Sequence, residues 1–327
     1  MMTCLVCGAG GAIGGHLARR LLDEGFSVRA VDIKPFQDWW QYHKEAENIQ
    51  ADLQQWPSCS TACEDIDYVY NLAAQMGGMG FIQNNRALCM LNVLINTHML
   101  MAARNHDVKR YFFSSSACAY HALRQNDPHV AALKEEDVLV DGGYAPEVGY
   151  GEEKLFAELM CKYFTEDFGL ETRVARFHNV YGPCSDWIGG REKAPAAICR
   201  KVAEAKLSGE HGYPIEVWGD GTCTRSFMWI GDCIEGIRRL MDSDVTQPLN
   251  IGSSELVTIN QLIAQVESIA HVIVKCEYDL TKPQGVRGRN SDNRLIQREL
   301  GWEPTTPLRE GLAKLYEWIR DEITKNK

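Results

Sequence analysis

The feature that most constrains the fold is a glycine-rich turn close to the start of the chain. Residues 3–7, TCLVC, have the character of a short buried strand, and the next seven residues read GAGGAIG. A helical pattern opens at about His16. Gly8, Gly11 and Gly14 therefore form a GxxGxxG turn between a strand and a helix, where the backbone can turn tightly and approach a ligand closely.

The same alternation of strand and helix continues along the chain. Four further strand patterns have helical stretches between most of them: residues 27–32, 67–74, 109–116 and 172–177. This alternation predicts an α/β fold, a Rossmann-type doubly wound parallel sheet with helices on both faces.

After about residue 177, loops that contain Gly and Pro interrupt this alternation. We therefore expect a dinucleotide-binding domain over residues 1–177, with a returning contribution from about 225–252. A smaller C-terminal α/β lobe, formed by residues 178–224 and 253–327, is expected to bind the substrate.

An acidic residue supports a dinucleotide site at the turn. Asp32 ends the second strand pattern, about twenty residues beyond the turn, where its carboxylate can bind both ribose hydroxyls. Because this carboxylate would repel a 2′-phosphate, NAD is favoured over NADP. The predicted cofactor-binding residues are those of the turn, the strand ends and the catalytic helix: Gly8, Gly11, Ala12, Ile13, Gly14, Asp32, Asp52, Leu53, Leu72, Ala73, Ala74, Tyr150 and Lys154.

The candidate catalytic residues are a phenol, an ammonium group and a hydroxyl. Tyr150 and Lys154, in YGEEK, lie four positions apart and share one face of a predicted helix. Ser116 ends the fifth strand. The lysine is expected to lower the pKa of the phenol from about 10, so that the phenolate removes an alcohol proton as hydride leaves, while Ser116 orients the alcohol.

Charge and composition exclude some classes of function. The net charge of −10 argues against a general nucleic-acid binder. Residues 282–294, KPQGVRGRNSDNR, form a local basic stretch that is either a site for a small anion such as a diphosphate or a solvated loop. No apolar run is expected to reach the roughly 20 residues that span a bilayer, and the start of the chain lacks the features of a signal peptide, so we expect a cytoplasmic protein without a membrane partner.

The twelve cysteines do not form a metal-binding pattern. Cys4 and Cys7 are three residues apart in a strand, so their side chains point to opposite faces of the sheet. The other cysteines are scattered singly, which is typical of reduced thiols in a cytosolic protein. We expect no metal site, and most of these thiols to pack in the core.

These motifs together resemble the extended short-chain dehydrogenase/reductase superfamily, whose members act on nucleotide sugars. The resemblance extends to RSFMWIGDC at 225–233, LNIGSS at 249–254 and LGWEPTTPLREGL at 300–312. Six further strings narrow this resemblance to one family, because together they look like the GDP-mannose 3,5-epimerases. They are NLAAQMGGMGFIQNN, SSACAY, RFHNVYGP, GGREKAPAA, WGDGTCTRSF and GVRGRNSDN. That family oxidises the sugar at C4 with bound NAD, epimerises neighbouring carbons through the 4-keto sugar, and returns the hydride.

The resemblance implies a role for Cys118, in SSACAY. A 4-ketone acidifies the protons at C3 and C5, and the matching cysteine of the family exchanges a proton with the ketosugar. A thiol titrates at about 8.5, close enough to neutrality for acid or base catalysis. Sugar-nucleotide 4,6-dehydratases carry an aspartate and a glutamate where this chain has Ala117 and Cys118, so dehydration is not expected.

The resemblance also implies a set of substrate contacts with a GDP-sugar. The predicted substrate-binding residues are glycine-loop, hydroxyl, amide and cationic groups: Gly77, Gly78, Met79, Ser116, Asn179, Lys193, Arg225, Arg287 and Arg289. Each cation could instead form a surface ion pair. The choice of GDP rests on the resemblance alone.

One position departs from the family's pattern. In DWIGGREKAP, residues 186–195, the residue after the tryptophan is Ile188, where the resemblance implies a lysine that acts as the second acid/base. Asp186, His121 or a water could substitute for it. The alternatives are therefore epimerisation at one carbon, C5, or chemistry confined to C4 as an oxidase or 4-epimerase.

Two further expectations concern assembly and class. Residues 86–104 are apolar on nearly every side, which suits a helix packed against the sheet and a partner, and family members form homodimers through this helix and the one that carries Tyr150. The alternative is a helix covered by the chain's own C-terminal lobe.

A non-catalytic sensor or scaffold that binds NAD is the alternative class of function. Members of the superfamily with such a role tend to lack the tyrosine and lysine.

Overall fold

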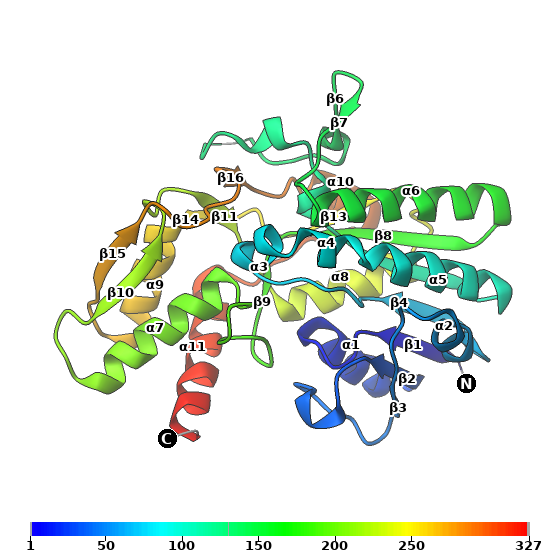
Figure 1. Cartoon of the computed structure of the whole chain (residues 1–327), viewed down its shortest axis with the longest axis horizontal. Helices are drawn as coiled ribbons and strands as arrows, with labels where there is room; N and C mark the ends of the chain where they lie inside the picture. Colours follow the sequence, from blue (N-terminus) through cyan, green and yellow to red (C-terminus); the bar gives the residue numbers. More distant parts are fainter. Residues whose placement is uncertain (1, 130, 326–327) are drawn as a thin grey trace.

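Seven parallel strands form the central sheet of this computed structural model, which describes residues 2–129 and 131–325 (Figure 1). The strand order is β13-β8-β5-β4-β1-β2-β3. The bounds are β1 Thr3–Cys7, β2 Ser27–Asp32, β3 Glu47–Gln50, β4 Tyr68–Asn71, β5 Arg110–Ser116, β8 Glu171–Phe177 and β13 Leu249–Ile251. The predicted Rossmann-type sheet is confirmed, and the predicted strands at 3–7 and 27–32 agree with β1 and β2 at both ends.

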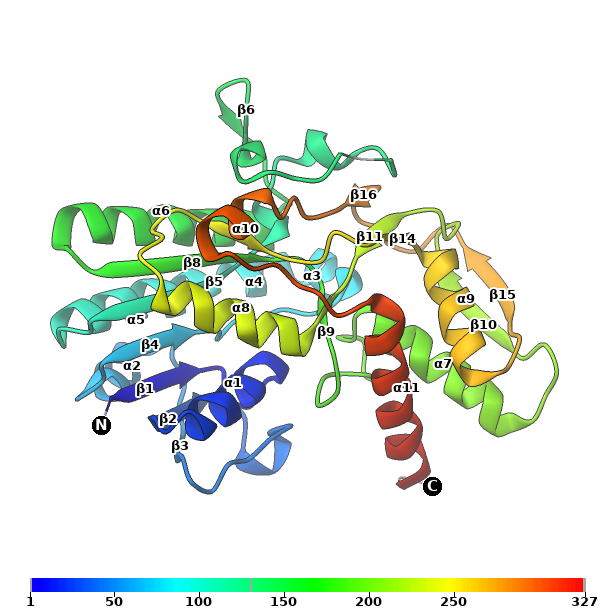
Figure 2. The same cartoon turned by 180° about the vertical axis from the view of Figure 1, so that it is seen from behind.

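Helices cover both faces of this sheet, as predicted (Figures 1 and 2). One face is packed by α2 (Trp56–Cys63), α5 (Asn92–Asn105) and α6 (Tyr150–Phe168), and the other by α1 (Ala12–Asp23) and α8 (Ile230–Asp242). Cys4 packs with the α1 side and Cys7 with the α2 side, because successive side chains of a strand alternate between faces. All twelve cysteines are free, and no cluster of metal-binding side chains occurs among the described residues.

A second core lies beside the carboxyl edge of the sheet. It is built from α7 (Ala194–Ser208), α9 (Ile259–Ala270) and α11 (Leu308–Lys325), with the parallel pair β10 (Pro214–Trp218) and β15 (Lys275–Asp279). Figure 1 shows this group at the end of the molecule opposite the N-terminus. The chain returns to the first sheet through α8 and β13 before it completes this second core.

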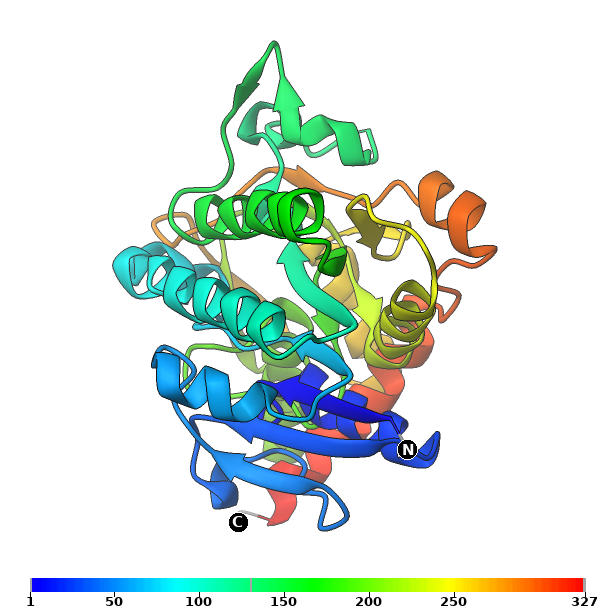
Figure 3. The same ribbon diagram turned by 90° about the vertical axis from the view of Figure 1, so that its right-hand side faces the viewer.

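Short elements connect these two parts. They are α3 (Met79–Asn84), α4 (Arg86–Met90), β9 (Val180–Tyr181), β11 (Thr224–Ser226), β12 (Met228–Trp229), β14 (Leu256–Thr258), β16 (Gly288–Arg289) and α10 (Arg294–Leu300). β11 pairs with β14 and β16, while β12 pairs with β9. A hairpin of β6 (Leu139–Val140) and β7 (Gly143–Tyr144) projects from the body of the molecule (Figure 3).

The stretch Arg86–Asn105, which contains α4 and α5, is the one helical segment among the described residues long and apolar enough to cross a membrane by length and composition. The expectation that no such run exists is therefore wrong for this segment, because charged side chains are scarce over α4 and α5. Core helices of soluble proteins pass the same test. Less than half of the segment is buried within the chain, and Met90, Leu91, Leu94 and Met101 are exposed.

Candidate active site

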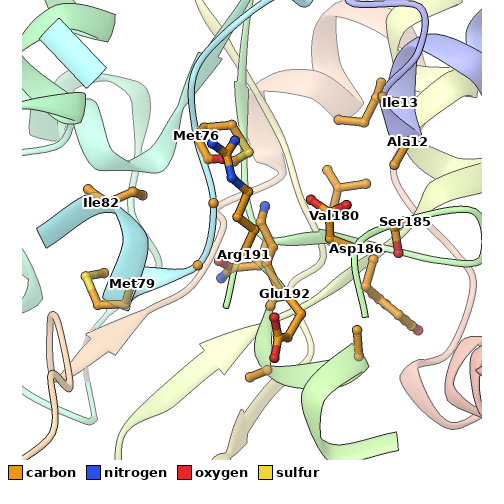
Figure 4. A pocket seen from close by; sticks show the side chains of 18 of the residues that line it. Ala12, Ile13, Met76, Met79, Ile82, Val180, Ser185, Asp186, Arg191 and Glu192 are labelled. Atoms are coloured by element: carbon orange, nitrogen blue, oxygen red, sulfur yellow. The ribbon is translucent and has the colours of Figure 1, made fainter. Parts of the chain in front are cut away.

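A cavity of about 870 Å³ runs along the carboxyl edge of the sheet from the glycine turn to the second core. Figure 4 shows Ala12 and Ile13, at the start of α1, on one side, and Met79 and Ile82, on α3, on the other, with Arg191 between them. In parallel α/β sheets this edge is where ligands bind. Every predicted cofactor-binding residue lines the cavity.

The glycine turn leaves no room for side chains. A Cβ on Gly14 would lie 2.2 Å from the Gly8 oxygen, and a Cβ on Gly8 would lie 3.0 Å from the backbone of Ala73. Gly8 also has a φ of +80°, which L side chains rarely adopt. The turn therefore brings bare backbone and the N-terminus of α1 to the cavity, as binding of a pyrophosphate requires.

Asp32 is held in place beside this turn. Its Oδ2 accepts a hydrogen bond from the Gly10 amide at 2.9 Å, and its Oδ1 accepts one from the Lys34 amide at 2.9 Å. The side chain is almost fully buried yet lines the cavity. A fixed carboxylate here fits a ribose with free hydroxyls better than one that carries a phosphate.

Lys154 provides an independent test of whether the site fits a dinucleotide. Its Nζ is buried and makes no hydrogen bond with any described residue, and its nearest carboxylate oxygen, Glu153 Oε2, is 4.0 Å away. A buried ammonium group without hydrogen bonds is costly unless a ligand satisfies it. Because Lys154 lines the cavity beside Tyr150, the ribose hydroxyls of a bound NAD would be suitable partners.

The structure corrects the expected titration of Tyr150. Burial raises the pKa of its phenol well above the ordinary value, the charges of Cys118, Glu153 and Cys89 add to this effect, and a hydrogen bond with Ser116 opposes it. Lys154 Nζ lies 5.4 Å from the centroid of the tyrosine ring. The expectation that this lysine brings the phenol's pKa towards neutrality is therefore not met in this structure.

Cys118 lies in the 3-10 turn that follows β5, against the start of α6. Its amide donates to Ser116 Oγ at 3.2 Å, and Arg289 Nη1 donates to its Sγ at 3.4 Å. The side chain is buried but lines the cavity together with Ser116 and Tyr150. Burial, and after it the carboxylate of Glu147, raises the pKa of the thiol to about 11, so the thiol is protonated at neutral pH.

Lys193, just before α7, lines the same cavity. Burial lowers the pKa of its ammonium group, and Arg289 lowers it further, whereas the neighbouring Cys118 raises it. A lysine with a lowered pKa is closer to the neutral form that removes protons. The cavity therefore holds a protonated thiol and an amine of reduced pKa.

Ile188 is not part of this arrangement. Its side chain is 60% exposed and does not line the cavity. Asp186 lines the cavity and accepts a hydrogen bond from Trp40 Nε1 at 3.2 Å. His121 is buried outside the cavity lining, where its Nδ1 accepts from the Leu123 amide at 3.2 Å.

The other predicted substrate residues separate into two groups. Gly77, Gly78, Met79, Ser116, Asn179, Lys193, Arg225 and Arg289 line the cavity. Arg287 does not: it is partly exposed, its Nη1 lies 3.9 Å from Asp220 Oδ2, and its Nη2 donates to Thr222 Oγ1 at 3.2 Å. Arg287 therefore lies outside the cavity lining, whereas the register of β16 directs Arg289 towards Cys118, and substrate binding by Arg287 stays a prediction.

Arg225 is another arginine that lines the cavity, and its side chain is partly buried. It donates to the backbone oxygens of Thr224, Gln284 and Val286. Burial and the nearby Arg289 lower its pKa to about 10. The two guanidinium groups and Lys193 give this end of the cavity the positive charge that an anionic ligand requires.

Sequence reasoning missed two residues that contact Arg289. Its Nη2 donates to Glu147 Oε2 at 2.9 Å, and its Nε donates to Gln125 Oε1 at 2.6 Å. These residues lie far from Arg289 in the chain and belong to no motif, so only the fold brings them together.

A Rossmann-type sheet with Tyr150 and Lys154 at its carboxyl edge defines an enzyme of the short-chain dehydrogenase/reductase kind. Residues 4–252 match the NAD dependent epimerase/dehydratase family. The chain belongs to this family, and NAD is its cofactor. The predictions of an NAD-dependent enzyme in this superfamily are thereby confirmed.

The chain is 46% identical to GDP-mannose 3,5-epimerase 1 of Oryza sativa subsp. indica over 98% of this chain and 82% of the relative. It is 45% identical to GDP-mannose 3,5-epimerase of Arabidopsis thaliana over 98% of this chain and 83% of the relative. Among solved structures, UDP-glucose 4-epimerase of Thermotoga maritima aligns with a TM-score of 0.87 at 24% identity, covering 98% of this chain and 100% of that one. This last likeness supports the fold alone.

Proposed function

We propose that this enzyme is a GDP-mannose 3,5-epimerase, or one close to it, that acts through a transient 4-keto sugar. The observation that carries the proposal is the presence of a thiol and an amine, Cys118 and Lys193, in the same cavity as Ser116, Tyr150 and Lys154. An enzyme confined to hydride transfer at C4 has no use for these two additional proton-transfer groups. The identity with the rice and Arabidopsis epimerases supports the same reaction.

Tyr150 and Ser116 serve the first step. NAD, when bound along the glycine turn and beside Tyr150, would supply the hydride acceptor and donor for C4 of the sugar. Tyr150 takes the proton of the C4 hydroxyl, Ser116 hydrogen bonds to the same oxygen, and Lys154 stabilises the phenolate charge that burial otherwise disfavours. Because the phenol's pKa is raised before substrate binds, this step depends on the ammonium group that the site leaves without a hydrogen-bond partner.

Lys193 and Cys118 serve the second step. The 4-ketone acidifies the neighbouring C–H bonds, and inversion then requires one group that removes a proton and another that returns one to the opposite face. The lowered pKa of Lys193 favours the removing role, and the raised pKa of Cys118 favours the returning role. Lys193 therefore takes the role that a lysine at position 188 was expected to have.

Arg225, with Asn179, supports recognition of the nucleotide diphosphate. A guanidinium group can bind phosphate oxygens in a bidentate manner. The choice of GDP is supported by the rice and Arabidopsis relatives.

The test is to incubate the purified enzyme with GDP-mannose in deuterium oxide and to locate deuterium by NMR. The proposal predicts deuterium at C3 and C5 with inversion at both carbons. Label at C5 alone would instead indicate a single-centre epimerase. Inversion at C4 without label, or accumulation of NADH without label, would exclude an enolate and overturn the proposal.

We further propose that the enzyme is a homodimer that pairs through α4, α5 and α6. The support is a group of exposed apolar side chains on neighbouring helices: Met90, Leu91, Leu94 and Met101 on α4 and α5, and Phe156 and Tyr163 on α6. Two copies of such a surface would cover each other's exposed apolar side chains.

Sedimentation should show a dimer at micromolar concentration, and Leu94→Asp should shift it to the monomer. Ile273→Asp, at an exposed site on the second lobe, is the matched control and should leave the dimer intact. A monomeric wild type would exclude the pairing. Wild-type protein that binds vesicles through this surface would indicate a membrane contact instead.

We also propose a cytoplasmic location, which twelve unpaired thiols support because an oxidising compartment favours disulfides. Cell fractionation tests this location. Recovery of the protein in a membrane or secreted fraction would contradict it.

A further inference from the structure

Glu147 precedes the catalytic helix and is held against Cys118 by two contacts. Its amide donates to the Cys118 carbonyl oxygen at 2.9 Å. Its side chain reaches the same cysteine through Arg289, which donates from Nη2 to Glu147 Oε2 at 2.9 Å and from Nη1 to the cysteine Sγ at 3.4 Å. The third donor of the guanidinium group, Nε, is used by Gln125 Oε1 at 2.6 Å, so the arginine cannot turn away without losing a hydrogen bond.

The Arg289 guanidinium group and the Glu147 carboxylate therefore place a positive and a negative charge close to the Cys118 thiol. The Arg289 and Glu147 side chains are 5% and 16% exposed, so solvent screens their charges weakly. A guanidinium group alone beside the sulfur would favour the thiolate. The carboxylate opposes this effect, and the pKa of Cys118 is raised to about 11, first by burial and then by Glu147, while Arg289 lowers it.

Other groups near the thiol also influence its pKa. Ser116 hydrogen bonds to the cysteine and lowers its pKa, and the charges of four further groups interact with it: Tyr150, Lys193, Arg225 and Arg289. Three of these four are cations that favour the thiolate. Glu147 is the ionised carboxylate that acts against them, because burial disfavours its charge but Arg289 holds its pKa below the ordinary range.

We propose that Glu147 is a positioning residue that keeps Cys118 in the thiol form, so that Cys118 donates a proton to the enolate and does not remove one from the sugar. This role rests on the proposed epimerase function. In the step, the S–H bond breaks and a C–H bond forms at the ring carbon, while the electron pair stays on sulfur. Arg289 then stabilises the thiolate until it regains a proton from solvent.

The first experiment measures the thiol directly and needs no substrate. Cys118 lines the cavity, so iodoacetamide can reach it, and mass spectrometry of its peptide gives the alkylation rate at each pH. Glu147→Gln removes the charge but keeps the shape and an oxygen for Arg289. We expect the pH midpoint of alkylation to fall by about one unit or more, as removal of a close carboxylate predicts. Glu136→Gln, at a side chain 75% exposed, is the matched control and should leave the midpoint unchanged.

The second experiment follows the reaction itself. In deuterium oxide with GDP-mannose, the Glu147→Gln enzyme should lose ring-carbon exchange at a lower pH than the wild type, while oxidation at C4 keeps its wild-type pH profile. Glu147→Asp, which keeps the charge, should restore the wild-type profile of exchange. A purely structural role would reduce both steps without moving either pH profile.

The outcomes separate this proposal from the proposed function. If the wild-type enzyme exchanges no deuterium but Glu147→Gln still shifts the pH midpoint of alkylation, the proposed epimerase function is wrong. The proposal that Glu147 keeps Cys118 in the thiol form is then still supported. An unchanged midpoint in folded Glu147→Gln enzyme overturns the proposal. If that variant does not fold, Arg289→Gln must shift the midpoint upwards, and an unchanged or lower midpoint again overturns it.

Discussion

The two halves of the cavity are built in different ways. The cofactor half presents bare backbone, because Gly8 and Gly14 pack against other main-chain atoms at distances that exclude a Cβ. The substrate half presents charge, because Lys193, Arg225 and Arg289 are gathered around one thiol. The first half depends on shape and the second on electrostatics. Added bulk should therefore impair NAD binding in the cofactor half, and loss of charge should weaken substrate binding in the substrate half.

Tyr150 serves both halves, and its loss should have the largest effect. Tyr150→Phe removes the group that accepts the C4 proton but little surface, so C4 oxidation should fall roughly 10²- to 10⁴-fold while NAD remains bound. NADH absorbance after addition of GDP-mannose measures the loss. Tyr144→Phe, at an exposed tyrosine of the projecting hairpin, is the control and should keep full activity. Equal activity in both variants would contradict the assignment.

Gly14→Ala should show that shape controls the cofactor half. The added Cβ would meet the Gly8 oxygen at 2.2 Å, so the turn must shift. We expect the free energy of unfolding to fall by about 1–3 kcal/mol, as overpacking typically costs, and NAD to be lost on purification. Chemical denaturation and absorbance of the purified protein measure both. Gly143→Ala, which meets its nearest atom at 3.7 Å, is the control, and an equal loss there would refute the argument.

Arg225→Gln should show that charge controls the substrate half. Hydrogen bonds to charged groups contribute about 1.5–3 kcal/mol, so the affinity for GDP-mannose should fall roughly tenfold or more while NAD stays bound. Titration calorimetry measures the change. Arg287→Gln, at an arginine outside the cavity lining, should have the smallest effect of these variants. A larger loss in Arg287→Gln than in Arg225→Gln would reverse our distinction between the two arginines.

The same contrast explains what the sequence could predict. The cofactor half follows from local rules: a glycine turn after a strand, an acid at the end of the next strand, and two residues four apart on one helix. All of these residues are found in the lining of one cavity. Local patterns suffice here because neighbouring strands of a parallel sheet bring their ends to one edge.

The substrate half could be predicted only in part, because its geometry depends on long-range packing. The sequence shows that residues 282–294 are basic, but it does not show which arginine of this stretch faces the cavity. The register of β16 against β11 decides this, and it selects Arg289. Glu147 and Gln125 belong to no motif and reach the site only through tertiary contacts with that arginine.

The sequence could not show where Ile188 lies relative to the cavity, for a related reason. The family resemblance implies a lysine at this position, but only the structure shows that the Ile188 side chain is exposed while Lys193, five residues later, lines the cavity. Similarly, the spacing of Tyr150 and Lys154 correctly placed both in the cavity, but it could not give the burial that dominates the phenol's pKa.

The central claim is that Lys193 and Cys118 are the two proton-transfer groups of the epimerisation. The most direct test compares Lys193→Met and Cys118→Ala with wild type in deuterium oxide, using GDP-mannose and NMR. Ile188→Lys is the control and should match the wild type. We predict that both variants still oxidise C4, that each loses or strongly slows exchange at a ring carbon, and that neither inverts both centres. Exchange at C3 and C5 at the wild-type rate in Lys193→Met would contradict the account.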